Sequence, residues 1–220
     1  MAIIYVFNDN DGGIEKYTRA PSDPMPYNIG GTLKVSEFMG TNAVGWTDTN
    51  TMNAWNTFRS FYGKPVQVSY AYLKVSQELA PLVKTVQHFA GTAFAVGGDL
   101  TAQGRQELYD DAVESDAFSV VQTYDGIAPH VYFDSRYLPS DYFVTFGLPV
   151  CSRGRKGNYC QTIQDILIAS GYNPGEADGI FGQNTEAAVR KFQSDRLLTD
   201  SGIVGLIEWN SLFNYDGVVV

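Results

Sequence analysis

The chain has 220 residues, of which 44% are hydrophobic, 14% aromatic and 18% charged, and its formal net charge is −9. This length allows one large or two small domains. The acidic balance argues against nucleic acid and anionic lipid surfaces as partners, because like charges repel, and no apolar run approaches the roughly 20 residues needed for membrane insertion.

The N-terminal stretch AIIYVF, at residues 2–7, predicts a first β-strand. No basic residue precedes it and no small-residue cleavage site follows it. It is also too short for the apolar part of a secretory signal. We therefore expect no signal peptide of the general secretory type.

Residues 1–149 are predicted to form an α+β domain, because helical spacing and period-2 alternation both occur there. Trp55, Phe58 and Phe61 recur at helical spacing, and Thr101 is placed to cap another helix. The expected helices cover 51–62 and 102–115, and the expected strands cover 66–72, 118–122 and 130–134.

Residues 150–158 are expected to be a basic linker, and residues 159–220 a small domain of three helices. Asn184 or Thr185 is predicted to cap the middle helix, between helices over 159–170 and 207–213. Apart from a Gly-Ile-(Phe or Val)-Gly turn that occurs twice, we find no internal repeat. The predicted core of this domain is apolar and consists of Leu167, Phe181, Val189, Phe192, Val204, Trp209 and Leu212.

The chain has two cysteines, Cys151 and Cys160, in the sequence CSRGRKGNYC. Their spacing is too wide for a CxxC redox or zinc pair. A disulfide between them is one interpretation for a protein outside the cytoplasm. The other is that Cys160 is a buried apolar residue and Cys151 a linker thiol.

Residues 171–205, GYNPGEADGIFGQNTEAAVRKFQSDRLLTDSGIVG, combine two glycine-centred turns with one amphipathic helix. This combination resembles the small helical peptidoglycan-binding domain of bacterial cell-wall enzymes. The resemblance implies that the partner is peptidoglycan or its stem peptides. It also implies a set of residues for wall contact, namely Tyr159, Tyr172, Asp178, Phe181 and Trp209. Two of them, Phe181 and Trp209, also fit the predicted core.

Two positions depart from that family. Ser201 stands where Asp is usual, and Glu208 stands where a capping Thr is usual. We expect the fold to tolerate both changes and the affinity for the wall to be more sensitive to them.

Five motifs in the first part of the chain resemble the zinc D-alanyl-D-alanine carboxypeptidase (DD-peptidase) family and follow its order. They are SDPMPY at 22–27, TLKVSEF at 32–38, QHFAGTAFAVG at 87–97, LTAQGR at 100–105 and HVYFDSRY at 130–137. A catalytic zinc of this kind has three protein ligands and one open position for water. The metal lowers the pKa of that water, and a nearby Glu takes its proton.

The resemblance implies that most of this chemistry is lost here. His88 stands at the first ligand position, but Ala95 replaces the ligand carboxylate. Tyr132, a phenol with an ordinary pKa of about 10, replaces the ligand His of the strand. Gln122 replaces the catalytic Glu and cannot accept a proton as a carboxylate does. We therefore expect a pseudo-enzyme with no intact catalytic residue and no cofactor.

A residual zinc site is the alternative, and it would need the chain's two histidines, His88 and His130. His130 and Asp134 share one face of the predicted strand. The resemblance implies instead that Asp134 is a structural partner of Arg136.

Three functions remain open from the sequence. The first is a non-catalytic protein that associates with peptidoglycan. The second is an assembly subunit of a wall-, spore- or phage-derived particle, in which the aromatic residues and the tail GVVV at 217–220 serve self-association. The third is a residual zinc peptidase or lytic enzyme. The location expected from the sequence is the bacterial cell wall, a spore or a phage-derived particle.

Overall fold

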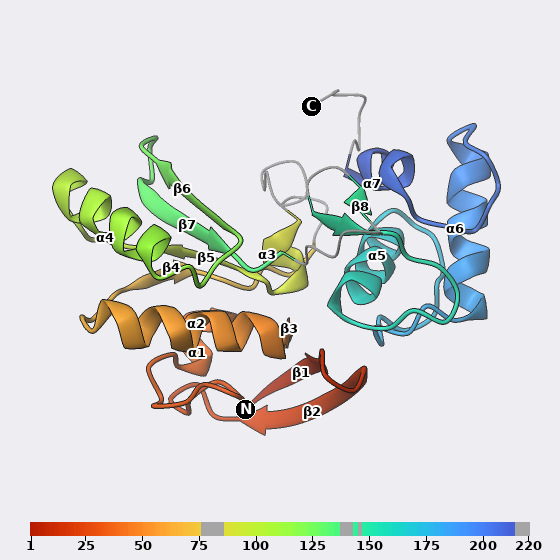
Figure 1. Ribbon diagram of the computed structural model, residues 1–220. Coiled ribbons are helices and arrows are strands. Elements are labelled where there is room, and N and C mark those ends of the chain that lie inside the picture. The colour runs from red at the N-terminus through yellow and green to blue at the C-terminus, as the bar shows by residue number, and fades with distance from the viewer. Residues whose placement is uncertain (76–85, 137–142, 145–146, 214–220) are drawn as a thin grey trace. The chain divides into compact units, whose positions relative to one another are not determined.

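The computed structural model describes residues 1–75, 86–136, 143–144 and 147–213 (Figure 1). The chain divides into two compact units: a first unit of residues 1–74 and 87–136, and a second unit of residues 75–86 and 137–220. Helices and strands are mixed along the chain, which confirms the predicted α+β class. The tail at 217–220, which we considered for self-association, lies outside the described residues.

A sheet with the strand order β2-β1-β3 opens the first unit. β1 (Ala2–Asn8) pairs antiparallel with β2 (Gly13–Arg19) and parallel with β3 (Val44–Asp48). Ile4 and Val6 are buried, because alternate side chains of a strand point to the same face. The predicted first strand is therefore confirmed.

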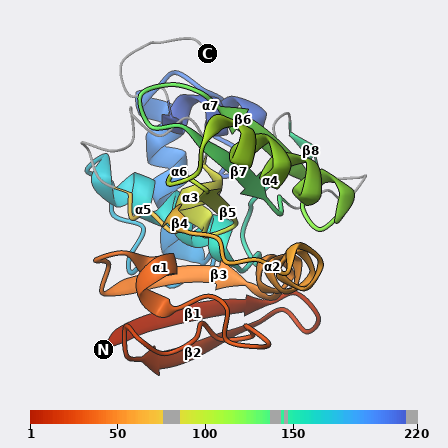
Figure 2. The same cartoon turned by 90° about the vertical axis from the view of Figure 1, so that its left-hand side faces the viewer.

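Two helices follow from the same part of the chain, α1 (Val35–Met39) and α2 (Thr49–Tyr62). Asp48 caps α2 by accepting a hydrogen bond from the backbone N–H of Thr51 over 2.7 Å. This cap starts the helix at Thr49, before the predicted residue 51. Figures 1 and 2 show α2 running between the first sheet and a second sheet.

The second sheet is antiparallel and has the strand order β4-β5-β7-β6. Its strands are β4 (Val68–Tyr70), β5 (Ala93–Val96), β6 (Val120–Tyr124) and β7 (His130–Asp134). β4 is shorter than the predicted strand 66–72, because its register with β5 shifts between Val68 and Tyr70.

β6 begins later than predicted because Phe118 leaves the strand and enters the core. Beside the sheet lie α3 (Gln87–Ala90) and α4 (Ala102–Glu114). Thr101 caps α4, as predicted, by accepting a hydrogen bond from the N–H of Gly104 over 3.1 Å.

One face of the second sheet packs into an aromatic core. The ring of Phe94 on β5 lies 4.6 Å from that of Trp55, and the ring of Phe133 on β7 lies 4.9 Å from that of Phe58. Because strand side chains alternate, Ala95 and the residues next to Phe133 point to the opposite face. That opposite face carries Ala95, Tyr132 and Gln122. Together with His88 we call them the vestigial positions, because the sequence predicts that they correspond to lost catalytic or metal-binding residues.

The second unit contains the short strands β8 (Phe143–Val144) and β9 (Leu148–Pro149) and three helices. The helices are α5 (Asn158–Ala169), α6 (Gln183–Asp195) and α7 (Leu206–Phe213). All members of the predicted mini-core are buried, which confirms it. Within the described residues, no helix is long and apolar enough to cross a membrane.

Two predictions for this unit are wrong. Neither Asn184 nor Thr185 caps α6, which begins directly after Gly182 with no side-chain cap. Residues 150–158 are not a free linker either. Cys151 exchanges backbone hydrogen bonds of 2.9 and 2.8 Å with Val204, so these residues are built into the second unit.

Candidate functional site

A buried glutamine of α5, Gln164, holds the first glycine turn of the second unit. Its Nε2 donates to Asp178 Oδ1 over 3.0 Å, to the carbonyl of Ile180 over 3.1 Å and to Thr185 Oγ1 over 3.0 Å. Its Oε1 accepts a hydrogen bond from the N–H of Gly179 over 2.9 Å. One side chain thus fixes both ends of the turn.

A second buried glutamine, Gln193 of α6, makes the same set of contacts with the second turn. Its Nε2 donates to Ser201 Oγ over 2.9 Å, to the carbonyl of Ile203 over 3.0 Å and to Glu208 Oε1 over 3.1 Å. Its Oε1 accepts a hydrogen bond from the N–H of Gly202 over 2.8 Å. We call these two arrangements the glutamine clamps.

The two glutamine clamps form an internal repeat, in contrast to our interpretation of the sequence. Gly179 and Gly202 have φ values of +74° and +72°, which glycine adopts without strain. This repeat is hard to recognise in the sequence, because the spacing between glutamine and glycine differs in its two copies. Gln164 lies 15 residues before Gly179, whereas Gln193 lies 9 residues before Gly202.

The two departures from the family keep their hydrogen-bonding roles. Ser201 Oγ accepts a hydrogen bond from the N–H of Ile203 over 3.2 Å, as Asp178 Oδ1 does from Ile180 over 2.9 Å. Glu208 takes the place of Thr185, and its second oxygen accepts a hydrogen bond from the N–H of Gly205 over 2.9 Å. The fold therefore tolerates both departures.

In the first unit, three of the four vestigial positions lie in one row across the second sheet. Ala95 on β5 is directly opposite Tyr132 on β7, and Tyr132 is directly opposite Gln122 on β6. Tyr70 on β4 continues the row on the other side of Ala95. Within this row Ala95 and Tyr132 are buried, whereas Gln122 is an exposed residue.

His88, the fourth vestigial position, is buried beside this row. Its Nδ1 lies 2.6 Å from the carbonyl oxygen of Ala71, so Nδ1 carries the proton of the neutral ring. Burial is the main cause that lowers the pKa of His88 to about 4, and nearby His130 acts in the same direction. At neutral pH this imidazole is uncharged.

Tyr132 and Asp134 are engaged with each other. The hydroxyl of Tyr132 donates to Asp134 Oδ2 over 2.7 Å, and Arg136 Nε donates to Asp134 Oδ1 over 2.8 Å. The ion pair confirms that Asp134 is a structural partner of Arg136, and the carboxylate raises the pKa of that guanidinium.

The aromatic rings on this face form a closed circuit, in which His130 also takes part. Neighbouring ring centroids are 4.8 Å apart for Tyr70 and His88, 5.7 Å for Tyr70 and His130, and 5.0 Å for His130 and Tyr124. Tyr132 closes the circuit, at 6.1 Å from Tyr124 and 5.6 Å from His88. Packed rings therefore line the space beside the row.

Residues 156–212 match the family model described as "Putative peptidoglycan binding domain". The match includes both glutamine clamps and the helices that carry them.

Residues 156–212 are a peptidoglycan-binding domain.

Two solved structures are similar to parts of the chain. The SleB N-terminal domain is 32% identical, and the match covers 30% of this chain and 89% of that chain with a TM-score of 0.29. A peptidoglycan-binding protein from Clostridioides difficile, in complex with glutamine hydroxamate, is 24% identical. That match covers 44% of this chain and 66% of the other, with a TM-score of 0.30. At these TM-scores neither likeness bears on the arrangement of the whole chain.

Within the peptidoglycan-binding domain, the residues predicted to contact the wall have different surroundings. Phe181 and Trp209 are fully buried, and Tyr159 is nearly so, which assigns their rings to the core rather than to a stacking surface. Tyr172 is partly exposed, with its ring 5.7 Å from that of Phe192. Asp178 is exposed and is engaged in the first clamp.

Sequence reasoning missed a pair of exposed apolar residues in the domain. Ile180 and Ile203 follow the two clamped glycines and occupy equivalent positions, with 42% and 43% of their surface exposed. The signal available in the sequence was their identical place in the repeated Gly-Ile turn.

The two cysteines at the domain's start are free thiols, and both are buried. A hydrogen bond with Cys151 is the main cause that raises the pKa of Cys160, and burial adds to it. The thiols are therefore neighbours, and the disulfide between them stays a prediction.

Proposed function

We propose that this is a non-catalytic protein of the bacterial cell wall or spore, which uses its peptidoglycan-binding domain to associate with the wall. The observation that carries the proposal is the pair of complete glutamine clamps within residues 156–212. They support binding because both turns that expose Ile180 and Ile203 are held rigidly from within.

The first unit is, in this proposal, a degenerate DD-peptidase scaffold. Ala95 has no donor atom for a metal, and the hydroxyl of Tyr132 is already donated to Asp134. Among the described residues, no three His, Cys, Asp or Glu side chains are grouped so that they could hold a metal ion. The side chains present do not fit the family's zinc, so we derive no hydrolytic step from them.

The direct test is sedimentation of the full chain with purified insoluble peptidoglycan. We expect retention well above that of an unrelated protein of matched net charge. Tyr172→Ala, which removes the most accessible ring of the predicted wall contacts, is expected to lower retention without unfolding the domain. If the full chain stays in the supernatant like the charge-matched control, the proposal is wrong.

A second experiment separates this proposal from a residual lytic enzyme. Metal analysis of the purified protein is expected to find less than about a tenth of an equivalent of zinc, since the site lacks the three protein ligands of a catalytic zinc. Digests of muropeptides with a large excess of protein are expected to leave every peptide bond intact. Stoichiometric zinc together with cleavage would favour the lytic enzyme instead.

A further inference from the structure

The first sheet has an open edge at β2. Among the described strands, β2 pairs with β1 alone, and Figures 1 and 2 show it at the margin of that sheet. Its pairing with β1 continues over all 7 residues without a bulge or a proline. A regular edge strand of this kind offers a row of backbone N–H and C=O groups to another strand.

The register of the sheet shows which backbone groups of β2 face outward. The N–H of Ile3 donates to the carbonyl of Ala43 over 2.9 Å, so the backbone of Ile3 faces β3 and that of Ile4 faces β2. Ile4 is directly opposite Tyr17, whose backbone groups are therefore used inside the sheet. The alternate residues of β2, which turn their N–H and C=O groups away from β1, are Ile14, Lys16 and Thr18.

The described residues leave these outward groups available. They form no hydrogen bond with another described residue. The open stretch ends at Ala20, because its N–H already donates to Asp23 Oδ2 over 2.7 Å.

Two opposite charges lie near this edge, at Glu15 and Arg19. Glu15 accepts hydrogen bonds from the hydroxyls of Tyr17 and Tyr27 and from the amide of Asn8. The guanidinium of Arg19 lies over the ring of Tyr17, 5.8 Å from its centre. Neither charge forms an ion pair with another described residue. Because strand side chains alternate, both charges share one face of β2.

A second copy of β2 can pair antiparallel with this edge in a register that matches these charges. A two-fold axis at Tyr17 places Glu15 of each copy opposite Arg19 of the other, and it places Lys16 opposite Thr18, so that outward backbone groups meet. Opposite charges placed across neighbouring strands stabilise the pairing.

The other two-fold registers are less favourable. An axis at Glu15 or at Lys16 would place like charges directly opposite each other, which is destabilising. An axis at Thr18 would need the N–H of Ala20, which is already bonded. Charges on an edge strand normally oppose pairing with unrelated strands, whereas here they select one register for a self-complementary strand.

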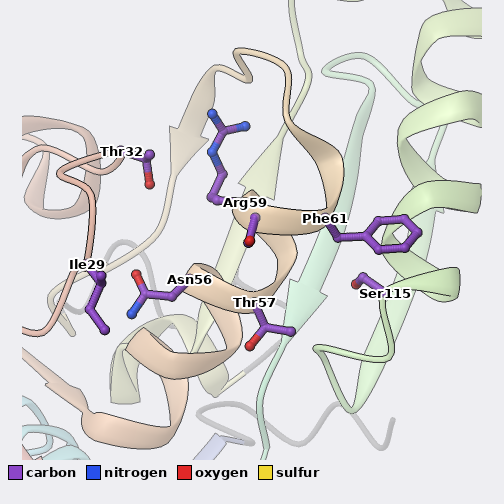
Figure 3. A pocket seen from close by; sticks show the side chains of 8 residues that line it. Ile29, Thr32, Asn56, Thr57, Arg59, Phe61 and Ser115 are labelled. Atoms are coloured by element: carbon purple, nitrogen blue, oxygen red, sulfur yellow. The ribbon is translucent and has the colours of Figure 1, made fainter.

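A groove beside α2 is another open feature of the first unit, but its side chains do not select a partner. It has a volume of about 740 Å³. The unpaired polar atoms of Asn56 and Arg59 are buried, so a ligand in the groove cannot contact them, and Phe61 points away from them (Figure 3). The charge pattern of β2 is therefore the more specific signal for a partner.

We propose that the protein forms a two-fold dimer through β2, which joins the 3-stranded sheets of two copies into one continuous sheet. The pairing adds about four backbone hydrogen bonds, from Lys16 and Thr18 of each copy. It also adds a Glu15–Arg19 ion pair on each side of the axis. The inference goes beyond the proposed function, since the dimer presents two copies of the peptidoglycan-binding domain to the wall.

The test is light scattering of the purified full chain at increasing protein concentration, at which we expect a monomer that converts to a dimer. Arg19→Glu places like charges opposite each other and is expected to weaken the dimer at least tenfold. The charge swap Glu15→Arg with Arg19→Glu is expected to restore it, because opposite charges again face each other. Arg196→Glu, the same charge change at an exposed position of the second unit, is the matched control and is expected to dimerise as the parent does.

Cross-linking tests the register. Tyr17→Cys places a thiol of each copy opposite the other across the axis, at a Cα separation of about 4.5 Å that suits a disulfide. Oxidised glutathione is expected to convert this variant to a covalent dimer at least tenfold faster than Thr18→Cys, whose two thiols are not opposed. The native Cys151 and Cys160 are buried and are not expected to react in the folded protein.

Three results would overturn the inference: a monomer at every concentration, a swap variant that dimerises no better than Arg19→Glu alone, or faster cross-linking through residue 18. Thermal melting of each variant shows whether it folds. If the swap variant does not fold, the comparison of Arg19→Glu with Arg196→Glu decides instead, and equal dimerisation of the two contradicts the inference. A chain that sediments with peptidoglycan but stays monomeric refutes only this inference. A chain that dimerises but does not sediment refutes only the proposed function.

Discussion

The amide of Gln193 donates a hydrogen bond to the carboxylate of Glu208 over 3.1 Å, where the equivalent amide of Gln164 donates to the hydroxyl of Thr185 over 3.0 Å. The glutamine amide at this position can thus donate its hydrogen bond to a hydroxyl or to a carboxylate. This explains how the second turn keeps its geometry although its sequence departs from the first. The clamps, rather than the residues they hold, are the constant element of the domain.

We therefore predict that Gln193→Leu destabilises the protein by about 2–4 kcal/mol, because it leaves the N–H of Gly202 and the carbonyl of Ile203 without this partner. Gln183→Leu, at an exposed position of the same helix, is the control and is expected to change stability by less than about 0.5 kcal/mol. Urea unfolding of both variants provides the measurement. Similar losses in the two variants would show that the clamp has no special role.

The buried His88 predicts a pH-dependent stability. Burial lowers its pKa from 6.5 to about 4, so the unfolded chain binds more protons than the folded chain between these two values. The free energy of unfolding therefore falls as the pH falls from about 6.5 to about 4, with a contribution of about 3 kcal/mol from this residue, and this contribution is constant above that window.

His88→Gln is expected to make the free energy of unfolding less dependent on pH between about 4 and 6.5. All other titrating groups contribute equally to the parent and to the variant. Urea unfolding of the parent and the variant across the window gives the difference directly. Parallel profiles would mean that His88 is not buried as an uncharged ring.

The vestigial row predicts how a metal site could be rebuilt. The triple change Ala95→Asp, Gln122→Glu and Tyr132→His places a carboxylate, a catalytic base and an imidazole at three opposed positions of β5, β6 and β7, near His88. We expect about one equivalent of zinc in the triple variant, because it restores three ligands with one open position.

The matched control for the triple variant is the double change Gln122→Glu with Tyr132→His, which still lacks the carboxylate at residue 95. We expect the double variant to bind zinc at least tenfold more weakly. A folded triple variant that takes up no zinc would show that the assignment of these positions to the DD-peptidase pattern is wrong.

The two thiols are predicted to be protected while the protein is folded. Cys151 and Cys160 are fully buried, which shields both sulfur atoms from reagents, and the raised pKa of Cys160 disfavours its reactive thiolate. Titration of the reduced protein with a thiol reagent is expected to be slow in buffer and to reveal both thiols after unfolding. Rapid modification of either thiol in buffer would contradict the burial.

The sequence predicted those features that depend on local patterns. The spacing of Trp55 and Phe58 predicted α2, and the apolar residues of the second unit predicted its core, because burial imposes periodicity on a chain. The boundary of α2 moved because the side chain of Asp48 caps it.

Other features depend on contacts that no local pattern reveals. Thr185 was one of the two residues predicted to cap α6, but its hydroxyl accepts a hydrogen bond from Gln164, 21 residues earlier. In the sequence, the aromatic side chains of Phe181 and Trp209 suited either a wall contact or the core. Only their burial in the folded domain assigns them to the core.

The central claim is that this chain holds peptidoglycan without cutting it, and one measurement tests both halves. Purified peptidoglycan is incubated with the full chain and sedimented, and the supernatant is analysed for released muropeptides. The account predicts that the protein is found in the pellet and that the supernatant contains no released fragments. Protein left in the supernatant, or fragments released in proportion to the protein added, would contradict it.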